Sequence, residues 1–242
     1  MKTLNGMYYF SSKGFANTIN GVSTRSMGRI KNSNKINPSN LRELTKTLNI
    51  PSENIFHMNQ KHTAHIELIH KHSPQELSNT DGLITKEKNK VLITVSADCL
   101  PLVFSDPNNK IVGVAHGGYR GILEGIVENM IEKFSQLGSS FSTITIGIGP
   151  SIGVCCYIVS KERIEQYKNR FPDFKNFFKK KNNTYFLDLQ SVILQILKQY
   201  KIPKKNIEFS NICNSCRNDI FFSYRKDSKE TYGEFATVIG ML

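Results

Sequence analysis

The chain has 242 residues, 39% of them hydrophobic, with five cysteines and a formal net charge of +12. These values suffice for one domain over residues 1–242, and the absence of a signal-peptide pattern, of a membrane-length apolar run and of a disulfide framework predicts a cytoplasmic protein with reduced thiols and no membrane partner. The lysines are diluted by asparagine and lack interleaved arginine and aromatic residues, which disfavours nucleic acid as a partner and leaves a small anionic substrate as an option.

The predicted elements alternate between strands and helices and include no repeat or long linker. In chain order they are a helix over 39–49 capped by Ser39, strands at 55–60, 64–70, 82–85, 91–96, 101–106 and 110–116, helices over 121–138, after Ser160 and from Asp188 to Tyr200, and strands at 206–210, 219–225 and 235–241. Several of these strands have the continuous apolar character of strands buried on both faces. The pattern predicts an α/β or α+β domain with a mixed sheet and helices on its faces.

Polar residues interrupt the ends of three strands. Cys99 follows one buried strand, beside Asp98; His116 ends another, before two glycines and a helix; and His62 lies in a polar loop between two strands. Strand ends that lead through glycines into a helix often carry binding and catalytic groups. From the residues alone, Cys99 can also be a small buried hydrophobe and His116 a histidine bonded to the backbone. An aspartate beside a cysteine in an apolar stretch, however, indicates an opening in the core.

Motifs at these positions belong to a longer series that covers nearly the whole chain. It comprises GVSTR (21–25), NQKHTAHI (59–66), DGLIT (81–85), ADCLPLVF (97–104), AHGGYRG (115–121), IGPSIGVCCYIV (148–159) and CNSCRNDIFFSYRKD (213–227). In order and spacing, the series resembles the laccase-domain family, also called multicopper polyphenol oxidoreductases or YfiH-type purine nucleoside phosphorylases. The resemblance implies a single three-layer α/β/α domain with a mixed β-sheet, whose zinc is held by His62, Cys99 and His116.

The chemistry of these three residues supports a metal site and leaves alternatives open. Two imidazoles and a thiolate with an open fourth position suit a catalytic zinc. The same residues allow a metal-free cysteine hydrolase, with Cys99 as the nucleophile and His116 or His62 as its base. A single copper is also possible at these ligands, but the six histidines of the chain fall short of the about ten that a four-copper oxidase needs.

For activity, the resemblance implies phosphorolysis of purine nucleosides such as adenosine, inosine and methylthioadenosine, with adenosine deamination as a related activity. Nucleoside and phosphate would then be the small-molecule partners of a monomer or small homo-oligomer. Two alternatives remain: a hydrolase that edits cell-wall peptide precursors with the same Cys/His/His site, and a non-catalytic binding module with the same fold. The presence of all three ligand residues favours an enzyme.

Polar and basic residues of the same motifs are candidates for substrate and phosphate contacts, because a guanidinium binds phosphate through two parallel hydrogen bonds. The candidates are Arg25, Gln60, Arg120, Tyr224 and Arg225. Glu234 stands where the family pattern favours arginine and is left outside the predicted site.

The other four cysteines carry weaker signals. Cys213 and Cys216 form a C-X-X-C pair that suits half a zinc ribbon or a redox pair, but no second half is evident in the sequence, so a reduced structural pair is expected. Cys155 and Cys156 follow the segment GPSIG, which lacks the lysine and spacing of a phosphate-binding loop. A turn that lines the cleft is expected there.

Overall fold

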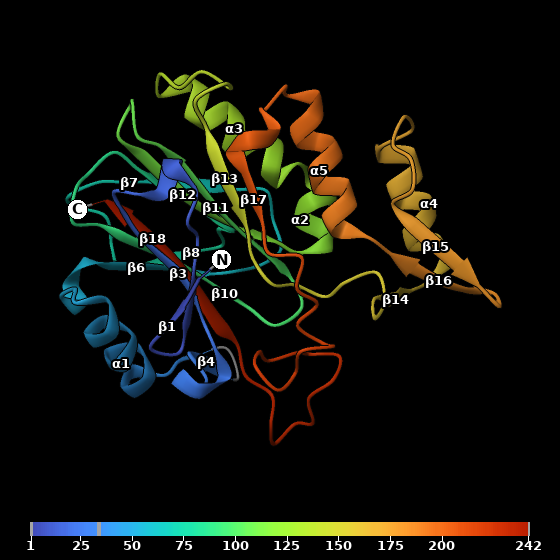
Figure 1. Ribbon diagram of the computed structural model, residues 1–242, viewed down its shortest axis with the longest axis horizontal. Coiled ribbons are helices and arrows are strands. Elements are labelled where there is room, and N and C mark those ends of the chain that lie inside the picture. Colours follow the sequence, from blue (N-terminus) through green and yellow to red (C-terminus); the bar gives the residue numbers. More distant parts are fainter. Residues whose placement is uncertain (1, 33–34, 242) are drawn as a thin grey trace.

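The strands build two large sheets in the computed structural model, which describes residues 2–32 and 35–241 (Figure 1). The first sheet has the strand order β1 (Lys2–Leu4), β2 (Met7–Tyr9), β3 (Thr18–Ser23), β18 (Phe235–Met241), β10 (Val91–Ser96), β6 (Ile55–Asn59), β8 (Glu76–Ser78). The second sheet has the order β17 (Ile207–Phe209), β13 (Thr145–Ile148), β11 (Leu100–Asp106), β12 (Ile111–Gly117), β9 (Gly82–Thr85), β7 (Ile66–Ile69). Each sheet combines parallel and antiparallel neighbours, so both are mixed.

Helices and two small sheets complete the described part of the chain. The α-helices are α1 (Pro38–Leu48), α2 (Tyr119–Glu124), α3 (Ile126–Gln136), α4 (Lys161–Arg170) and α5 (Leu189–Gln199). The 3-10 helices are η1 (Lys13–Phe15), η2 (Arg25–Met27), η3 (Ser52–Asn54) and η4 (Lys204–Asn206). The small sheets are β14 (Ile158–Val159) with β16 (Thr184–Leu187) and β15 (Phe178–Lys181), and β4 (Lys31–Asn32) with β5 (Lys35–Ile36). Among the helices of the described ranges, none has the length and apolar character needed to cross a membrane.

The two large sheets pack face to face, and side chains alternate between the core they share and the cores under the helices. Along β10, Leu92 points into the shared core, whereas Val91 and Ile93 pack in the core beneath α1. Along β11, Val103 belongs to the shared core, and Phe104 packs against the α3 side with its ring centroid 5.9 Å from that of Phe134. Both strands are therefore buried on both faces, which explains their continuous apolar sequences.

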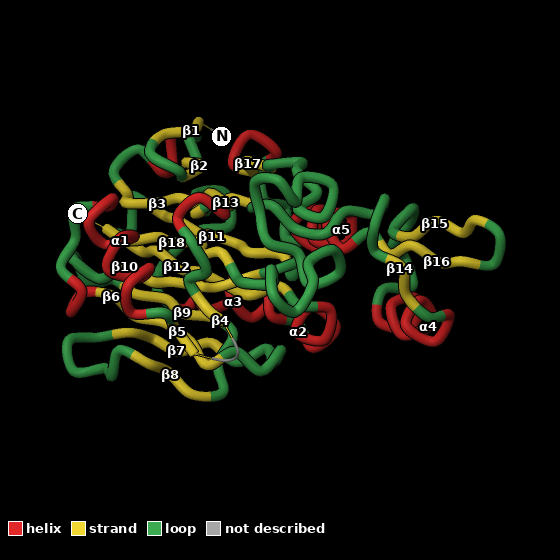
Figure 2. The backbone as a smooth tube through the Cα atoms, turned by 90° about the horizontal axis from the view of Figure 1, so that it is seen from below, coloured by secondary structure: helices red, strands yellow, loops and turns green. Residues whose placement is uncertain are grey.

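The mixed α/β class predicted from the sequence is confirmed, with a layering that differs from the expected one. Two stacked sheets, rather than a single sheet, lie between α1 on one outer face and α2, α3 and α5 on the other. Figure 2 shows the strands gathered at the centre, with α4 and the β14–β16–β15 sheet extending to one side. A strand buried on both faces has the same apolar sequence pattern whether a helix or a second sheet covers it. The sequence pattern therefore could not distinguish the two arrangements.

The long helix predicted over 121–138 is two helices. Gly125 breaks it with a left-handed backbone (φ 95°), and its N–H donates to the carbonyls of Gly121 and Ile122 at the end of α2. The break turns α3 so that its apolar residues, among them Met130 and Phe134, pack on the second sheet. Helical spacing continues across the glycine, so periodicity alone did not reveal the break.

Two local predictions were wrong for reasons of hydrogen bonding. The first helix begins at Pro38 and is capped by Asn37, whose Oδ1 accepts from the backbone N–H of Ser39 at 3.0 Å, so Ser39 lies inside the helix. The segment 219–225, in which Phe221 and Phe222 are both buried, forms turns instead of a strand. The backbone N–H groups that follow bond to carboxylates rather than to a neighbouring strand.

Candidate active site

The three predicted ligands lie where the chain crosses from the first sheet to the second. The parallel neighbours β6 and β10 end at the same edge; β6 leads through the loop that carries His62 to β7, and β10 leads through Cys99 to β11. His116 joins them because β12 pairs antiparallel with β11, which sets His116 opposite Pro101, just after Cys99. The fold therefore gathers three segments, well separated in sequence, at one edge of the sheets.

These three side chains could hold a metal ion. Their ligand atoms all lie within 4.8 Å of one another, and Cys99 Sγ is 3.6 Å from His62 Nε2. The imidazole rings of His62 and His116 meet edge to face, with centroids 4.9 Å apart. Glycine at position 118 permits this approach, because a Cβ on Gly118 would collide with the ring of His62. Two imidazoles and a thiolate are donors that both zinc and copper bind.

Asp81 organises this centre without belonging to the donor set. Its fully buried carboxylate accepts hydrogen bonds of 2.8–3.0 Å from the backbone N–H groups of Lys61, His62 and Thr63. The same carboxylate lies 2.8 Å from His116 Nδ1, which leaves Nε2 of that ring as the ligand atom. One side chain thus fixes both the loop of His62 and the orientation of His116.

Burial and charge oppose each other at this centre. Burial raises the pKa of the Cys99 thiol, but His116 and His62 outweigh it and lower the pKa to about 7. Burial lowers the pKa of His116, but Cys99 and Asp81 raise it to about 10. For Asp81, burial raises the pKa, and the hydrogen bond from His116 together with the backbone donors brings it down to about 2. The surroundings favour the thiolate of Cys99, the form that binds metal.

Asp98 ties the neighbouring turns together. Its backbone is left-handed (φ 87°), and its buried carboxylate accepts from Asn214 Nδ2 at 3.0 Å, Ser223 Oγ at 2.7 Å and the Arg225 N–H at 2.8 Å. Burial outweighs these hydrogen bonds and raises the pKa of Asp98. Through these three hydrogen bonds, Asp98 holds the turns over 213–227 against the site.

A cavity of about 410 Å³ opens in front of the Cys/His/His centre. A volume in this range is typical of small-molecule sites. The cavity is lined by Lys31, Gln60, His62, Val95, Ser96, Ala97, Asp98, Cys99, His116, Tyr119, Tyr157, Arg163, Tyr224, Arg225, Tyr232 and Glu234. Four tyrosines and three basic side chains thus surround the potential metal site.

Two of the basic side chains are arginines that stack on tyrosines. The guanidinium carbon of Arg163, from α4, lies 3.7 Å from the ring centroid of Tyr119, and its Nη1 donates to the Tyr157 hydroxyl at 3.4 Å. The guanidinium carbon of Arg225 lies 5.3 Å from the ring centroid of Tyr157, and its Nη1 donates to the backbone carbonyl of Ile158 at 3.1 Å. Stacking orients the planar donors of both residues at the cavity wall.

The structure brings some of the predicted substrate residues together and separates others. Gln60, Tyr224 and Arg225 line the cavity. The side-chain amide of Gln60 also makes two hydrogen bonds with β10: its Nε2 donates to the Val95 carbonyl, and its Oε1 accepts from the Val95 N–H. Arg25 and Arg120 are not part of the cavity lining.

Arg25 and Arg120 have other contacts. Arg25 Nη2 donates to both carboxylate oxygens of Asp227, at 2.8 and 2.9 Å, and its guanidinium carbon lies 4.3 Å from the ring centroid of Phe222. Arg120 is exposed, and its Nε donates to the hydroxyl of Tyr119 at 2.8 Å. Arg25 therefore fastens the turns over 218–227, and Arg120 reaches the cavity only through Tyr119.

Several cavity residues were missed by sequence reasoning. Arg163 lies on a helix with few buried positions, and nothing in its sequence indicates that it faces the site. Tyr119 lies inside the motif AHGGYRG, which also contains His116, so its position near the site could have been inferred. Lys31 and Glu234 meet in an isolated antiparallel bridge between distant segments, and Glu234, which was left outside the predicted site, lines the cavity with Lys31.

The stacked sheets and the Cys/His/His centre beside a polar, aromatic cavity define an α/β protein with a potential metal site. Residues 20–242 match the family model described as multi-copper polyphenol oxidoreductase laccase. The chain therefore belongs to this laccase family, as its motifs predicted.

Relatives in this family carry phosphorylase names. The chain is 30% identical over 208 residues to the human protein named purine nucleoside phosphorylase LACC1, a match that covers 84% of this chain and 46% of the relative. It is 31% identical over 213 residues to purine nucleoside phosphorylase YlmD of Geobacillus stearothermophilus, covering 84% of this chain and 77% of that protein. The chain spans about half the length of its human and mouse relatives.

Solved structures share the fold. The crystal structure of YlmD from Geobacillus stearothermophilus superposes with a TM-score of 0.92 at 27% identity, covering 100% of this chain and 98% of that one. The YfiH protein of Bacillus licheniformis superposes with a TM-score of 0.87 at 26% identity, covering 99% of this chain and 100% of the other. The name purine nucleoside phosphorylase is carried by the YlmD proteins of Bacillus subtilis and Geobacillus stearothermophilus.

Proposed function

We propose that this chain is a zinc-dependent purine nucleoside phosphorylase that acts on adenosine, inosine and methylthioadenosine. The observation that carries the proposal is the placement of His62, Cys99 and His116 beside a cavity of about 410 Å³ with aromatic and basic walls. The phosphorylase names of relatives about 30% identical support the same reaction class. One domain over residues 1–242, a cytoplasmic location and a monomer or small homo-oligomer remain part of the proposal.

His62, Cys99 and His116 would hold the metal, with copper as the other ion that suits these donors. A bound zinc would supply a Lewis acid that polarises an oxygen of the reactants. Asp81 keeps His116 Nε2 available as a ligand, because it occupies Nδ1. The low pKa of Cys99, about 7, keeps a large share of the thiol ionised near neutral pH before any metal binds.

The other cavity residues would bind the two substrates. Tyrosine rings offer flat faces for a purine, and the stacked guanidinium groups of Arg163 and Arg225 offer paired donors to phosphate. Glu234, whose carboxylate accepts a hydrogen bond from Tyr232 at 2.9 Å, offers an acceptor to ribose hydroxyls. Together these contacts would orient a phosphate oxygen toward C1′ of the nucleoside.

The reaction then forms one bond and breaks another. A phosphate oxygen bonds to C1′ of the ribose while the bond from C1′ to N9 of the purine breaks. The electron pair of that bond leaves with the purine, which takes up a proton. The products are ribose-1-phosphate and the free base.

Product analysis tests the proposal. Purified protein loaded with zinc is incubated with adenosine in the presence and absence of phosphate, and the products are separated by liquid chromatography. We expect adenine and ribose-1-phosphate in equal amounts, formed only when phosphate is present. Failure to form adenine with phosphate and a metal-loaded centre would reject the proposal.

Adenosine deamination is a second candidate, because one relative points to it. The chain is 30% identical over 152 residues, 62% of this chain and 58% of the relative, to a prokaryotic protein named adenosine deaminase RL5. Deamination would use water in place of phosphate: a water oxygen bonds to C6 of the purine, the bond from C6 to the amino nitrogen breaks, ammonia leaves, and the glycosidic bond stays intact. Inosine formed without phosphate would identify this activity in the same incubations.

A further inference from the structure

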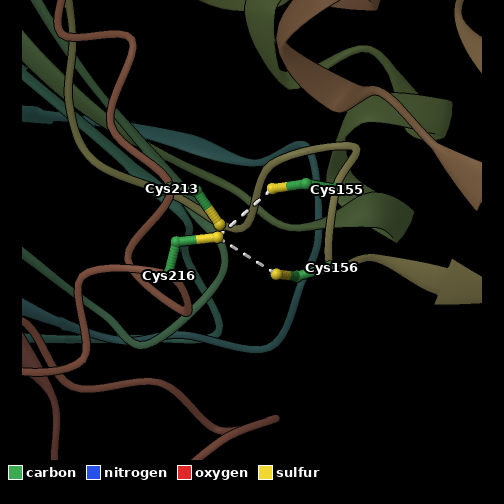
Figure 3. A group of neighbouring side chains, drawn as sticks. All are labelled: Cys155, Cys156, Cys213 and Cys216. Carbon is green, nitrogen blue, oxygen red and sulfur yellow. Dashed lines mark hydrogen bonds between the residues drawn. The ribbon is translucent and has the colours of Figure 1, made fainter.

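Four cysteines outside the cavity form a compact cluster, although they come from two segments far apart in the sequence (Figure 3). Cys155 and Cys156 lie in the turn between β13 and β14, and Cys213 and Cys216 lie in the turns that follow β17. All four Sγ atoms lie within 4.8 Å of one another. Cys155 and Cys156 thus add two thiols beside the C-X-X-C pair of Cys213 and Cys216.

The spacing of the sulfur atoms suits one ion at their centre. Cys216 Sγ lies 3.5 Å from Cys155 Sγ and 3.4 Å from Cys156 Sγ. A tetrahedral zinc with Zn–S bonds of about 2.3 Å separates its sulfur ligands by about 3.8 Å. The observed distances are close to this value and far above the about 2.05 Å of a disulfide bond.

The backbone around the cluster also resembles a metal knuckle. The C-X-X-C spacing of Cys213 and Cys216 is the one that structural zinc sites use. The Gly153 N–H donates to Cys213 Sγ at 3.2 Å, and such donors stabilise a thiolate. A Cβ on Gly153 would lie 3.3 Å from Cys155 Sγ and 3.1 Å from the Cβ of Cys213, so glycine gives the two pairs room to meet.

Adjacent cysteines fit disulfide chemistry poorly. Across a trans peptide the Cα atoms of Cys155 and Cys156 are about 3.8 Å apart, below the about 4.4–6.8 Å usual for a disulfide. The two neighbouring thiols and the two thiols of the C-X-X-C pair together can supply the four ligands of one ion.

We propose that Cys155, Cys156, Cys213 and Cys216 form a structural tetrathiolate site for Zn²⁺, separate from the Cys/His/His centre. All four ligand positions belong to protein, so this site has no open position for a substrate. Its role is to lock the turn after β13 to the turns after β17.

The proposed zinc site would position two walls of the cavity. Tyr157 follows directly after Cys156, and Asn214, next to Cys213, binds Asp98 and so holds the turn of Arg225. Only a few backbone hydrogen bonds join the two segments otherwise, including those between Ser151 and its partners Ile212 and Asn214. A metal at the cluster would therefore fix the positions of Tyr157 and Arg225 relative to each other.

Metal content and coordination test the proposal without using activity. Wild type should bind two zinc ions per chain after purification with a reductant and zinc. Cys99→Ser is the matched control, because it makes the same chemical change in the other centre. We expect Cys99→Ser to keep one zinc ion and Cys213→Ser/Cys216→Ser to lose the cluster ion while retaining the other.

X-ray absorption at the zinc edge of Cys99→Ser then reads the cluster directly, even where the double variant folds poorly. The expected first shell has four sulfur atoms at about 2.3 Å and no nitrogen. A zinc-free Cys99→Ser protein, a shell with nitrogen ligands, or four cysteines recovered as two disulfides in non-reducing mass spectrometry would each overturn the proposal. None of these outcomes depends on whether nucleosides are substrates, so the two proposals stand or fall separately.

Discussion

The Cys/His/His centre and the four-cysteine cluster are both built from loop side chains, but their surroundings differ. In the first, a fully buried carboxylate, Asp81, holds the His62 loop and the ring of His116, and three donors face a cavity. In the second, the thiols of Cys155 and Cys216 are exposed, the Gly153 backbone N–H donates to Cys213 Sγ, and none of the four cysteines lines the cavity. A site for chemistry leaves a position open and fixes its ligands through a second layer, whereas a structural site closes on itself.

The largest expected difference between the two regions is in the response to cysteine replacement. Cys99→Ser should remove the metal of the Cys/His/His centre and lower phosphorolysis by about 100-fold or more, because an alcohol is a poor substitute for a thiolate ligand. Cys216→Ser should lower it by less than about 10-fold, since the cluster only supports the cavity walls. Steady-state rates and zinc content measured together check this contrast, and equal losses in the two variants would contradict it.

Asp81 gives the next test, because it positions ligands without being one. Asp81→Asn should weaken zinc binding at the Cys/His/His centre by about 10–100-fold, since the amide cannot accept all the donors that the carboxylate accepts. Competition with a chromophoric chelator measures this affinity.

Asp106→Asn is the matched control for that variant. Asp106 is equally buried and accepts several hydrogen bonds, among them 2.8 Å bonds from Asn109 Nδ2 and Thr143 Oγ1, at a distance from the centre. Its replacement should lower the free energy of unfolding by about 1–3 kcal/mol while zinc affinity stays unchanged. If both variants lose stability and neither loses zinc affinity, Asp81 is only a structural residue.

A smaller effect separates Arg163, which lines the cavity, from Arg120, which lies outside it. Arg163→Ala should raise the KM for phosphate by about 10-fold, the effect of losing one charged hydrogen bond of about 1.5 kcal/mol. Arg120→Ala should change it by less than about 3-fold, because Arg120 is exposed and touches the cavity only through Tyr119. Phosphate saturation curves for the two variants measure these changes. A larger rise in the KM for phosphate in Arg120→Ala than in Arg163→Ala would mean that Arg120, and not Arg163, binds phosphate.

The sequence predicted what periodicity and motifs encode and missed what depends on distant hydrogen bonds. The buried strands, the helices after Ser160 and from Asp188, and the grouping of His62, Cys99 and His116 were all predicted and are found in the structure. The role of Asp81 was not predicted, because its partners are backbone N–H groups of another loop and such bonds leave no spacing in the sequence.

Two further features were hidden for different reasons. The stacking of two sheets was missed because a strand buried on both faces has the same continuous apolar sequence whether a helix or a second sheet covers it. The four-cysteine cluster was missed because its two pairs lie in separate loops, which the parallel pairing of β13 with β17 and the bridge between Ser151 and Cys213 bring together. Local sequence could not indicate that pairing.

We propose that a metal held by His62, Cys99 and His116 is required for phosphorolysis. The most direct measurement is a zinc titration of metal-free protein carrying Cys213→Ser/Cys216→Ser, so that one centre remains, with adenine formation followed at each step. We expect activity to rise in proportion to bound zinc and to stop rising at one ion per chain, and we expect Cys99→Ser to abolish the rise. Full activity in the metal-free protein, or a rise that persists with Cys99→Ser, would contradict it.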